Sequence, residues 1–124
     1  MALLVQKYGG TSVGTIERIE AVADRGLKHK QQGDDIVVVV SAMSVETNRL
    51  IELAKRIDAS PSAREMDVLL STGEQVTIAL LSIALMKRGL DARSYTGSQI
   101  RITTDSAHGK ARIQKIDTEA MRAD

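Results

Sequence analysis

A run of five β-branched residues at positions 36–40, Ile-Val-Val-Val-Val, constrains the fold of this chain more than any other stretch. An apolar run of this kind is typical of a parallel strand that is covered on both faces. A shorter apolar run lies at residues 3–5, and between the two runs apolar residues recur at helical spacing over residues 16–27. Strand, helix and strand in this order predict a βαβ unit with a right-handed crossover.

Helix signals bound the segments around this unit. Thr15 precedes the first helical pattern and is suited to cap it, whereas Gly33 is suited to end it. Residues 50–57 form a second amphipathic pattern. We expect that helix to end before Pro61, because a proline disfavours the helical conformation in the residue before it.

A longer helical run follows and ends at residues 87–89, where two basic residues precede a glycine. Ser62 and Glu65 have the spacing of a capping box at its start. Gly73 lies inside the run, and a glycine there costs about 1 kcal/mol relative to alanine, so we expect a break or kink. Residues 75–86 are apolar nearly all round, which predicts deep burial.

The C-terminal third of the chain has weaker signals. We expect a third strand at residues 92–96, a loop at 97–110 with a short strand at 100–102, a further strand at 111–116, and then a helix starting at 117 or 118. A sheet with so hydrophobic a central strand needs cover on both faces, and the predicted helices supply part of it. The sequence therefore favours an α/β fold and a piece of a larger domain.

Charge and composition exclude several classes of partner. The net charge is +1, there is no Phe or Trp, and there is no Cys, so we expect no nucleic-acid partner, no disulfide and no cysteine-based metal site. The N-terminus becomes polar after residue 5, which argues against a secretory signal. The apolar run at 76–86 is interrupted by Thr77 and Ser82 and is too short to span a bilayer. We therefore expect a soluble, cytoplasmic protein with no membrane partner, and we assign no metal ligand.

The loop KYGGTSVG, residues 7–14, supports two chemical hypotheses. Residues 10–14 match G-x-S-x-G, the nucleophile elbow of serine hydrolases. A triad of Ser12, Asp105 and His108 is compatible with the spacing. However, an elbow usually follows several strands, and this one follows the first, so the hydrolase is the less favoured hypothesis.

A phosphate cradle explains more of the same residues. Gly9 and Gly10 lack a Cβ, so their backbone can approach an anion closely or adopt a positive φ. The loop leads into the N-terminus of a helix, which favours negative charge, and Lys7 supplies an ammonium group. Thr11 and Ser12 add hydroxyl donors. A plain Gly-Gly turn between strand and helix is an equally good interpretation of the loop taken alone.

Four blocks of the sequence together resemble one family. Residues 7–13 resemble the K-x-G-G-T-S opening of aspartate kinases, a branch of the amino-acid kinase superfamily. The blocks VVVVSAM at 37–43 with Thr47, STGEQ at 71–75 and GSQIRITTD at 97–105 follow in the order and spacing of that family. The resemblance implies a three-layer α/β/α fold with a mainly parallel sheet. Family members are longer, so it also implies that residues 1–124 are the N-terminal part of a kinase domain, without its remainder and without the regulatory ACT domains.

The resemblance also implies an activity. Aspartate kinases transfer the γ-phosphoryl group of ATP to the side-chain carboxylate of L-aspartate, giving 4-phospho-L-aspartate on the route to lysine, threonine and methionine. ATP and Mg²⁺ are then the expected cofactors, with Mg²⁺ held through the ATP phosphates, and the parent enzyme is expected to be oligomeric. Lys7 is the expected catalytic residue, because it can stabilise charge on the transferred phosphoryl group. The residues expected to bind ATP or its phosphates are Lys7, Tyr8, Gly9, Gly10, Thr11, Ser12 and Ser41.

By the same resemblance, Thr47 and Glu74 bind L-aspartate. A Glu74 carboxylate can pair with the substrate ammonium, although the residues alone favour an exposed helix glutamate, and Thr47 alone suggests a helix N-cap. Residues 103–105 are expected either to flank the substrate pocket or to form a turn, and His108 to lie in a surface loop. Two alternatives remain open: another enzyme of the superfamily, and a phosphate-binding module without turnover.

One position departs from the family pattern. Relatives carry a glycine at one of the two positions that Ser44 and Val45 occupy here. A β-branched residue at positive φ is a strong outlier. If the loop requires positive φ at Val45, we expect a shifted or strained loop and weaker positioning of Thr47.

Overall fold

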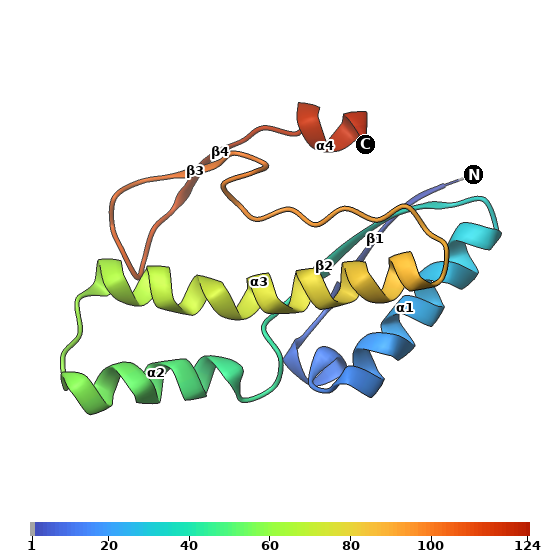
Figure 1. Cartoon of the computed structure of the whole chain (residues 1–124). Coiled ribbons are helices and arrows are strands. Elements are labelled where there is room, and N and C mark those ends of the chain that lie inside the picture. Colours follow the sequence, from blue (N-terminus) through green and yellow to red (C-terminus); the bar gives the residue numbers. More distant parts are fainter. Residues whose placement is uncertain (1) are drawn as a thin grey trace.

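A computed structural model describes residues 2–124, apart from the side chain of Ala120. The elements follow one another along the chain as shown in Figure 1. They are β1 (Leu3–Tyr8), the 3-10 helix η1 (Gly10–Val13), α1 (Ile16–Gln31), β2 (Asp35–Val40), α2 (Glu46–Ile57), α3 (Ala63–Lys87), β3 (Ile102–Thr104), β4 (Ile113–Ile116) and α4 (Glu119–Ala123).

The predicted βαβ unit is confirmed. β1 and β2 pair in parallel, with Leu3 opposite Asp35 and Tyr8 opposite Val40. Thr15 caps α1, because its hydroxyl oxygen accepts a hydrogen bond from the backbone N–H of Arg18 at 3.2 Å. Past the end of α1, Gly33 has a φ of 88°, which a residue with a side chain rarely adopts.

The described helices cover one face of the two strands. Tyr8, Val38 and Val40 pack against the core on that face. On the opposite face Leu3 and Val5 are each 67% exposed. Val39 of β2 is also 46% exposed. Within the described residues the helices thus supply only part of the cover that this strand needs, as the sequence predicts for a piece of a larger domain.

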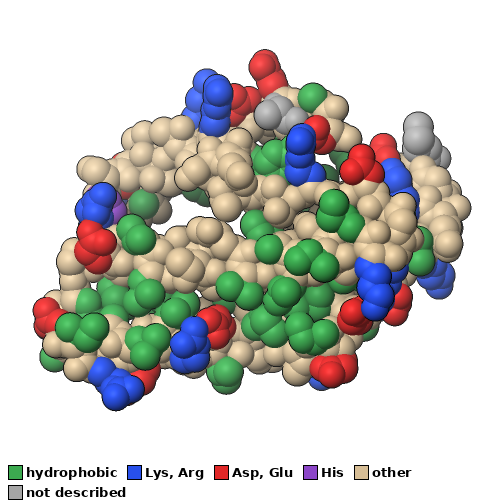
Figure 2. All heavy atoms as spheres, viewed as in Figure 1, with side chains coloured by type: hydrophobic (Ala, Val, Ile, Leu, Met, Phe, Trp, Pro, Cys, Tyr) green, Lys and Arg blue, Asp and Glu red, His purple; other side chains and the backbone are tan. Residues whose placement is uncertain are grey.

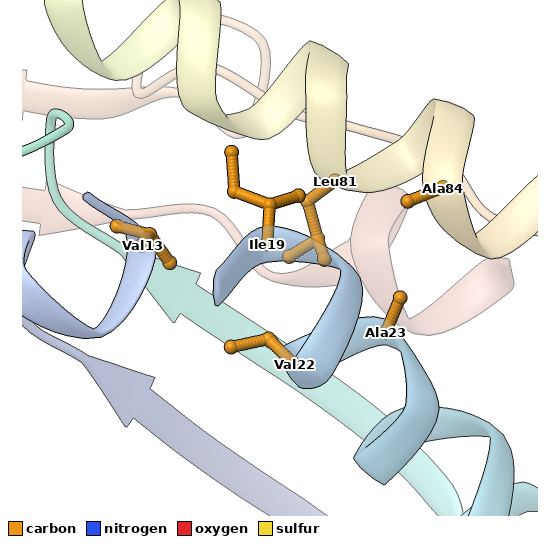
Figure 3. Close-up of a cluster of buried hydrophobic side chains, with 6 residues drawn as sticks. All are labelled: Val13, Ile19, Val22, Ala23, Leu81 and Ala84. Carbon is orange, nitrogen blue, oxygen red and sulfur yellow. The ribbon is translucent and has the colours of Figure 1, made fainter. Parts of the chain in front are cut away.

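The core lies between α1 and α3. Its buried residues are Val13, Ile19, Val22, Ala23, Leu81 and Ala84. Figure 3 shows Ile19 of α1 beside Leu81 of α3, and Ala23 facing Ala84. Arg88, just past α3, adds polar contacts: it donates hydrogen bonds to Asp24 at 2.8 Å and to the Glu20 carboxylate. These two helices are thus joined by apolar packing around Leu81 and Ala84 and by the charged contacts of Arg88.

Replacing Ile19 by alanine tests the role of this core. Ile19 is 2% exposed, so the variant should lose about 3 kcal/mol of unfolding free energy through lost burial and the cavity left behind. Ile57→Ala is the matched control: Ile57 is 91% exposed, and its replacement should change the free energy by less than about 0.5 kcal/mol. Urea unfolding measures both. Equal losses would show that the core is placed wrongly.

α3 is one continuous helix through Gly73, so the predicted break is wrong. Gly73 is buried beside the loop that follows β2, and packing there outweighs its low helix propensity. Ser62 is the N-cap as expected, but its side chain makes no capping bond. Within residues 75–86 the predicted deep burial holds for Thr77, Leu81 and Ala84, whereas Ile83 is 63% exposed.

α3 is also longer than the apolar run suggested. Among the described helices, α3 is the one that is long and apolar enough to cross a membrane, judged by length and composition alone. Core helices of soluble proteins pass the same test. In this structure α3 packs against α1 and α2 (Figure 1), and 22% of its apolar stretch is buried among the described residues.

The C-terminal segment differs most from expectation. Residues 92–96 are not a strand, because no described strand pairs with them, and an isolated strand leaves its backbone groups without partners. The expected short strand is displaced to β3, which pairs antiparallel with β4. Figure 2 shows an open gap between this segment and α3. Its tip is held at the start of α3, where the Asp67 carboxylate accepts the Gly109 N–H at 2.9 Å.

Candidate active site at the ends of β1 and β2

Two loops meet at the carboxyl ends of the parallel strands, where open α/β sheets bind ligands. The phosphate loop, residues 9–14, follows β1, and the β2–α2 loop, residues 41–45, follows β2. Ser44 N–H donates to Gly10 O at 3.1 Å and joins the two loops, while Ser41 N–H donates to Tyr8 O, at the end of β1, at 3.3 Å. The two loops therefore form one unit.

Close packing explains two of the glycines in the phosphate loop. A methyl carbon added at Gly10 would lie 3.0 Å from Ala42 O, and one added at Gly14 would lie 2.9 Å from Ser44 Cβ. Neither Gly9 nor Gly10 has a positive φ, so close approach and not backbone freedom is what requires glycine. The G-x-S-x-G match thus reflects packing of one loop on the other.

Gly9 differs from these two glycines. A methyl carbon at Gly9 would meet no atom within 4 Å, so the surface of the loop is open there. The next residues are less free: Ser12 N–H donates to Gly9 O at 3.0 Å, and Val13 is fully buried. Ser12 therefore has its hydroxyl, and not its amide, to offer to a ligand, whereas Thr11 is exposed.

Lys7 and Tyr8 lie on opposite faces of β1. Lys7 is exposed on the open face, and within residues 2–124 it makes no hydrogen bond or ion pair, so its ammonium group is free for a ligand. Tyr8 packs against the core, and its hydroxyl donates to Gln6 Oε1 at 3.2 Å. The side chain of Tyr8 is thus engaged within the protein, and its carbonyl oxygen already accepts the Ser41 N–H.

Val45 has a positive φ, the backbone conformation for which the sequence predicted a strained loop. Its φ is 64°, and it is the N-cap of α2 with no side-chain capping bond. The expectation of a strained loop is confirmed, since a β-branched side chain is disfavoured at this φ. The alternative interpretation of Thr47 as the N-cap is wrong, because Thr47 is the second residue of α2.

The proposed aspartate-binding residues lie beside the contact of α2 with α3. A methyl carbon at Gly73 would lie 3.0 Å from Ala42 Cβ and 3.7 Å from Glu46 Cγ. Thr47 directly follows Glu46, and Glu74 directly follows Gly73. Both Thr47 and Glu74 are exposed. The structure thus brings their backbones to the same place as the two loops.

The two glutamates at this contact differ in charge balance. Arg49 donates two hydrogen bonds to the Glu46 carboxylate, at 2.7 and 3.1 Å, and these bonds lower the pKa of Glu46 below its ordinary value. Glu74 has no hydrogen bond or ion pair to any other residue that the structure describes. Its carboxylate is therefore the one available for a cationic group of a ligand.

The C-terminal residues that sequence reasoning considered are elsewhere. The Asp105 carboxylate accepts the N–H groups of Ala107 at 3.1 Å and Arg112 at 3.3 Å, so residues 103–105 belong to a hairpin and its turn. His108 is exposed at the tip of this hairpin. In Figure 1 the hairpin and η1 lie on opposite sides of α3, so Ser12, Asp105 and His108 do not form a hydrolase triad. Among residues 2–124, no cluster of His, Asp and Glu is suited to hold a metal ion.

Sequence reasoning missed the residues that hold the site together. Ala42, Ser44 and Gly14 form the contacts between the loops, and Gly73 forms the contact with α3. None of them carries reactive chemistry. The sequence contains one indication of these contacts, the glycine inside a helix at position 73. In the structure this glycine allows close packing and does not break the helix.

The chain is similar to known kinases over its whole length. A model of the amino acid kinase family matches residues 2–123. The chain is 67% identical over 124 residues to an aspartate kinase of Pseudomonas putida and 57% identical over 121 residues to aspartokinase 2 of Bacillus subtilis. It covers 100% and 98% of its own length in these matches and 30% of each relative. A crystal structure of aspartate kinase from Synechocystis matches 79% of this chain and 17% of that chain, with 57% identity and a TM-score of 0.76.

Proposed function

The chain belongs to the amino acid kinase family, and from this we propose that it is the N-terminal part of an ATP-dependent aspartate kinase. It spans about 30% of the length of the curated relatives it matches. In this proposal the rest of the kinase domain and the ACT regulatory domains belong to the longer protein, a soluble cytoplasmic oligomer. The observation that carries the proposal is the joined pair of loops with a free Lys7 ammonium, an open Gly9 and an unpaired Glu74 around it.

The proposed reaction suits the groups that this site offers. The side-chain carboxylate of L-aspartate is ionised at neutral pH and is itself a nucleophile, so no catalytic base is needed. Catalysis then depends on positioning and on neutralising charge. Lys7 would stabilise the transferred phosphoryl group, while the open backbone at Gly9, with Gly10 next to it, would hold the ATP phosphates.

The remaining assignments complete this site. Thr11 and Ser12 would donate hydroxyl hydrogen bonds to phosphate oxygens. Tyr8 would contribute by fixing the end of β1, from which Lys7 reaches the phosphates. Ser41, half-buried at the end of β2, would contact phosphate or substrate. ATP would bring Mg²⁺ with it, held through its phosphates and not by a ligand in this chain.

L-aspartate would bind between the two loops and α3. The free Glu74 carboxylate would pair with the α-ammonium group of the substrate, and Thr47 would donate a hydrogen bond from the first turn of α2. The Arg49–Glu46 pair matters here, because an unpaired Glu46 would compete for the same ammonium group.

A panel of acceptors tests the proposal with the full-length protein. ADP release should depend on L-aspartate and not on acetylglutamate or UMP, which other kinases of the superfamily phosphorylate. ADP release driven by either of those acceptors would replace the proposal with another kinase. Binding of ATP without turnover by any acceptor would favour a non-catalytic module.

Replacing Val45 by glycine tests the strain in the β2–α2 loop. Glycine adopts a φ of 64° without the steric conflict of a β-branched side chain. The variant should lower the KM for L-aspartate by about two- to fivefold, because strain of about 1 kcal/mol or less no longer opposes the binding geometry of Thr47. Steady-state kinetics at saturating ATP measures it. An unchanged KM for L-aspartate would show that the strain at Val45 has no effect on substrate binding.

A further inference from the structure

Ala42 is held between the phosphate loop and α3. It is 5% exposed. Its carbonyl oxygen lies 3.0 Å from the position of a methyl carbon on Gly10, and its own Cβ lies 3.0 Å from the position of one on Gly73. Both contacts are tighter than ordinary van der Waals packing, so neither glycine can gain a side chain unless a neighbour moves.

Gly73 has no conformational reason to be glycine. Its φ is not positive, and α3 is continuous through it. The other neighbours of an added methyl carbon, Leu50 Cδ1 at 3.6 Å and Glu46 Cγ at 3.7 Å, lie at ordinary contact distances. The Ala42 methyl group is therefore the one neighbour that requires glycine in this turn of the helix.

We infer that Ala42 and Gly73 are positioning residues whose contact sets the distance between the phosphate loop and the aspartate-binding residue Glu74. The inference rests on the proposed function. Glu74 follows Gly73 on a rigid helix, and Ala42 is fixed to the phosphate loop through Gly10 and the Ser44–Gly10 bond. The contact thus determines how far the substrate ammonium site lies from the phosphoryl group.

The direction of movement follows from these restraints. The β2–α2 loop is bonded to the phosphate loop and moves with it, so an added methyl group at Gly73 displaces α3 by a few tenths of an ångström. Glu74 then moves relative to the phosphates, whereas the phosphates keep their own contacts. Aspartate binding should weaken while ATP binding is retained.

A methyl exchange tests this in the full-length enzyme. Gly73→Ala should raise the KM for L-aspartate about tenfold, because small displacements from reactive geometry have large kinetic effects. Gly73→Ala combined with Ala42→Gly moves the methyl group from the loop to the helix and restores the spacing. The double variant should return the KM for L-aspartate to within about twofold of the parent value. The KM for ATP should stay within about twofold in all variants.

Gly26→Ala is the matched control. Gly26 is also a buried glycine in a helix packed on α3, and its added methyl carbon would lie 3.2 Å from Leu85 Cδ2, away from the two loops. This variant should leave both KM values unchanged. Melting temperatures of the three variants show whether any of them folds less stably. A merely structural role would not raise the KM for L-aspartate while leaving the KM for ATP unchanged.

The outcomes distinguish the inference from the proposed function. An active parent enzyme whose KM for L-aspartate is unaffected by Gly73→Ala, or not restored by the exchange, would overturn the positioning role alone. A parent protein that forms no ADP with L-aspartate would overturn the proposed function and the positioning role together.

Discussion

Replacing Lys7 by alanine in the full-length enzyme should lower kcat for phosphoryl transfer by about 100- to 1,000-fold, the range seen when one fixed group that stabilises transition-state charge is removed. Lys7 is exposed at the end of β1, next to the open backbone of Gly9, and no other described residue neutralises its charge. Its ammonium group is therefore available for the phosphoryl oxygens, whose charge shifts during transfer.

The control for Lys7 is another lysine. Lys28 is exposed in the last turn of α1, outside both loops, and Lys28→Ala should leave kcat unchanged. Rapid mixing that follows single-turnover ADP formation measures the chemical step separately from product release. Normal kcat in the Lys7→Ala variant would refute the catalytic role, and the cradle would then be a binding module.

Replacing Glu74 by glutamine should raise the KM for L-aspartate by about 10- to 100-fold, because a hydrogen bond to a charged group contributes roughly 1.5–3 kcal/mol. Glutamine keeps the size of the side chain and removes its charge. The loss should therefore appear in aspartate binding, and the KM for ATP should not change. Steady-state kinetics with each substrate varied in turn measures both values.

Glu65→Gln is the matched control for Glu74. Glu65 lies on the same helix, near its start, and pairs with Arg64 at 2.5 Å. Its replacement should leave both KM values unchanged. If the Glu74→Gln variant keeps the parent KM for L-aspartate, Glu74 does not bind the substrate and is an ordinary exposed glutamate of the helix.

Local signals predicted the elements close to the site. Thr15 and Gly33 bound α1 where the sequence placed its ends, because a cap and a positive φ are properties of a few neighbouring residues. The strain at Val45 was also predictable, since the side chain and the backbone of one residue decide it. The βαβ unit was also predictable, because the spacing of apolar residues within each segment indicates a strand or a helix.

Contacts between distant segments were not predictable in this way. Gly73 was expected to break α3, but it accommodates Ala42, which lies 31 positions earlier in the sequence, and no local pattern records that contact. Residues 92–96 have the composition of a strand and no described strand beside them. The composition of a segment sets what it can form, whereas its neighbours decide what it does form.

Trapping of the product tests the central claim most directly. An acyl phosphate such as 4-phospho-L-aspartate reacts with hydroxylamine to give a hydroxamate, whereas ATP hydrolysis gives only ADP and phosphate. With the full-length protein, MgATP and L-aspartate, we predict aspartyl hydroxamate in equal amount to the ADP formed, and none when L-aspartate is omitted. ADP without hydroxamate, or a hydroxamate formed equally well from another carboxylate, would contradict the assignment to an aspartate kinase.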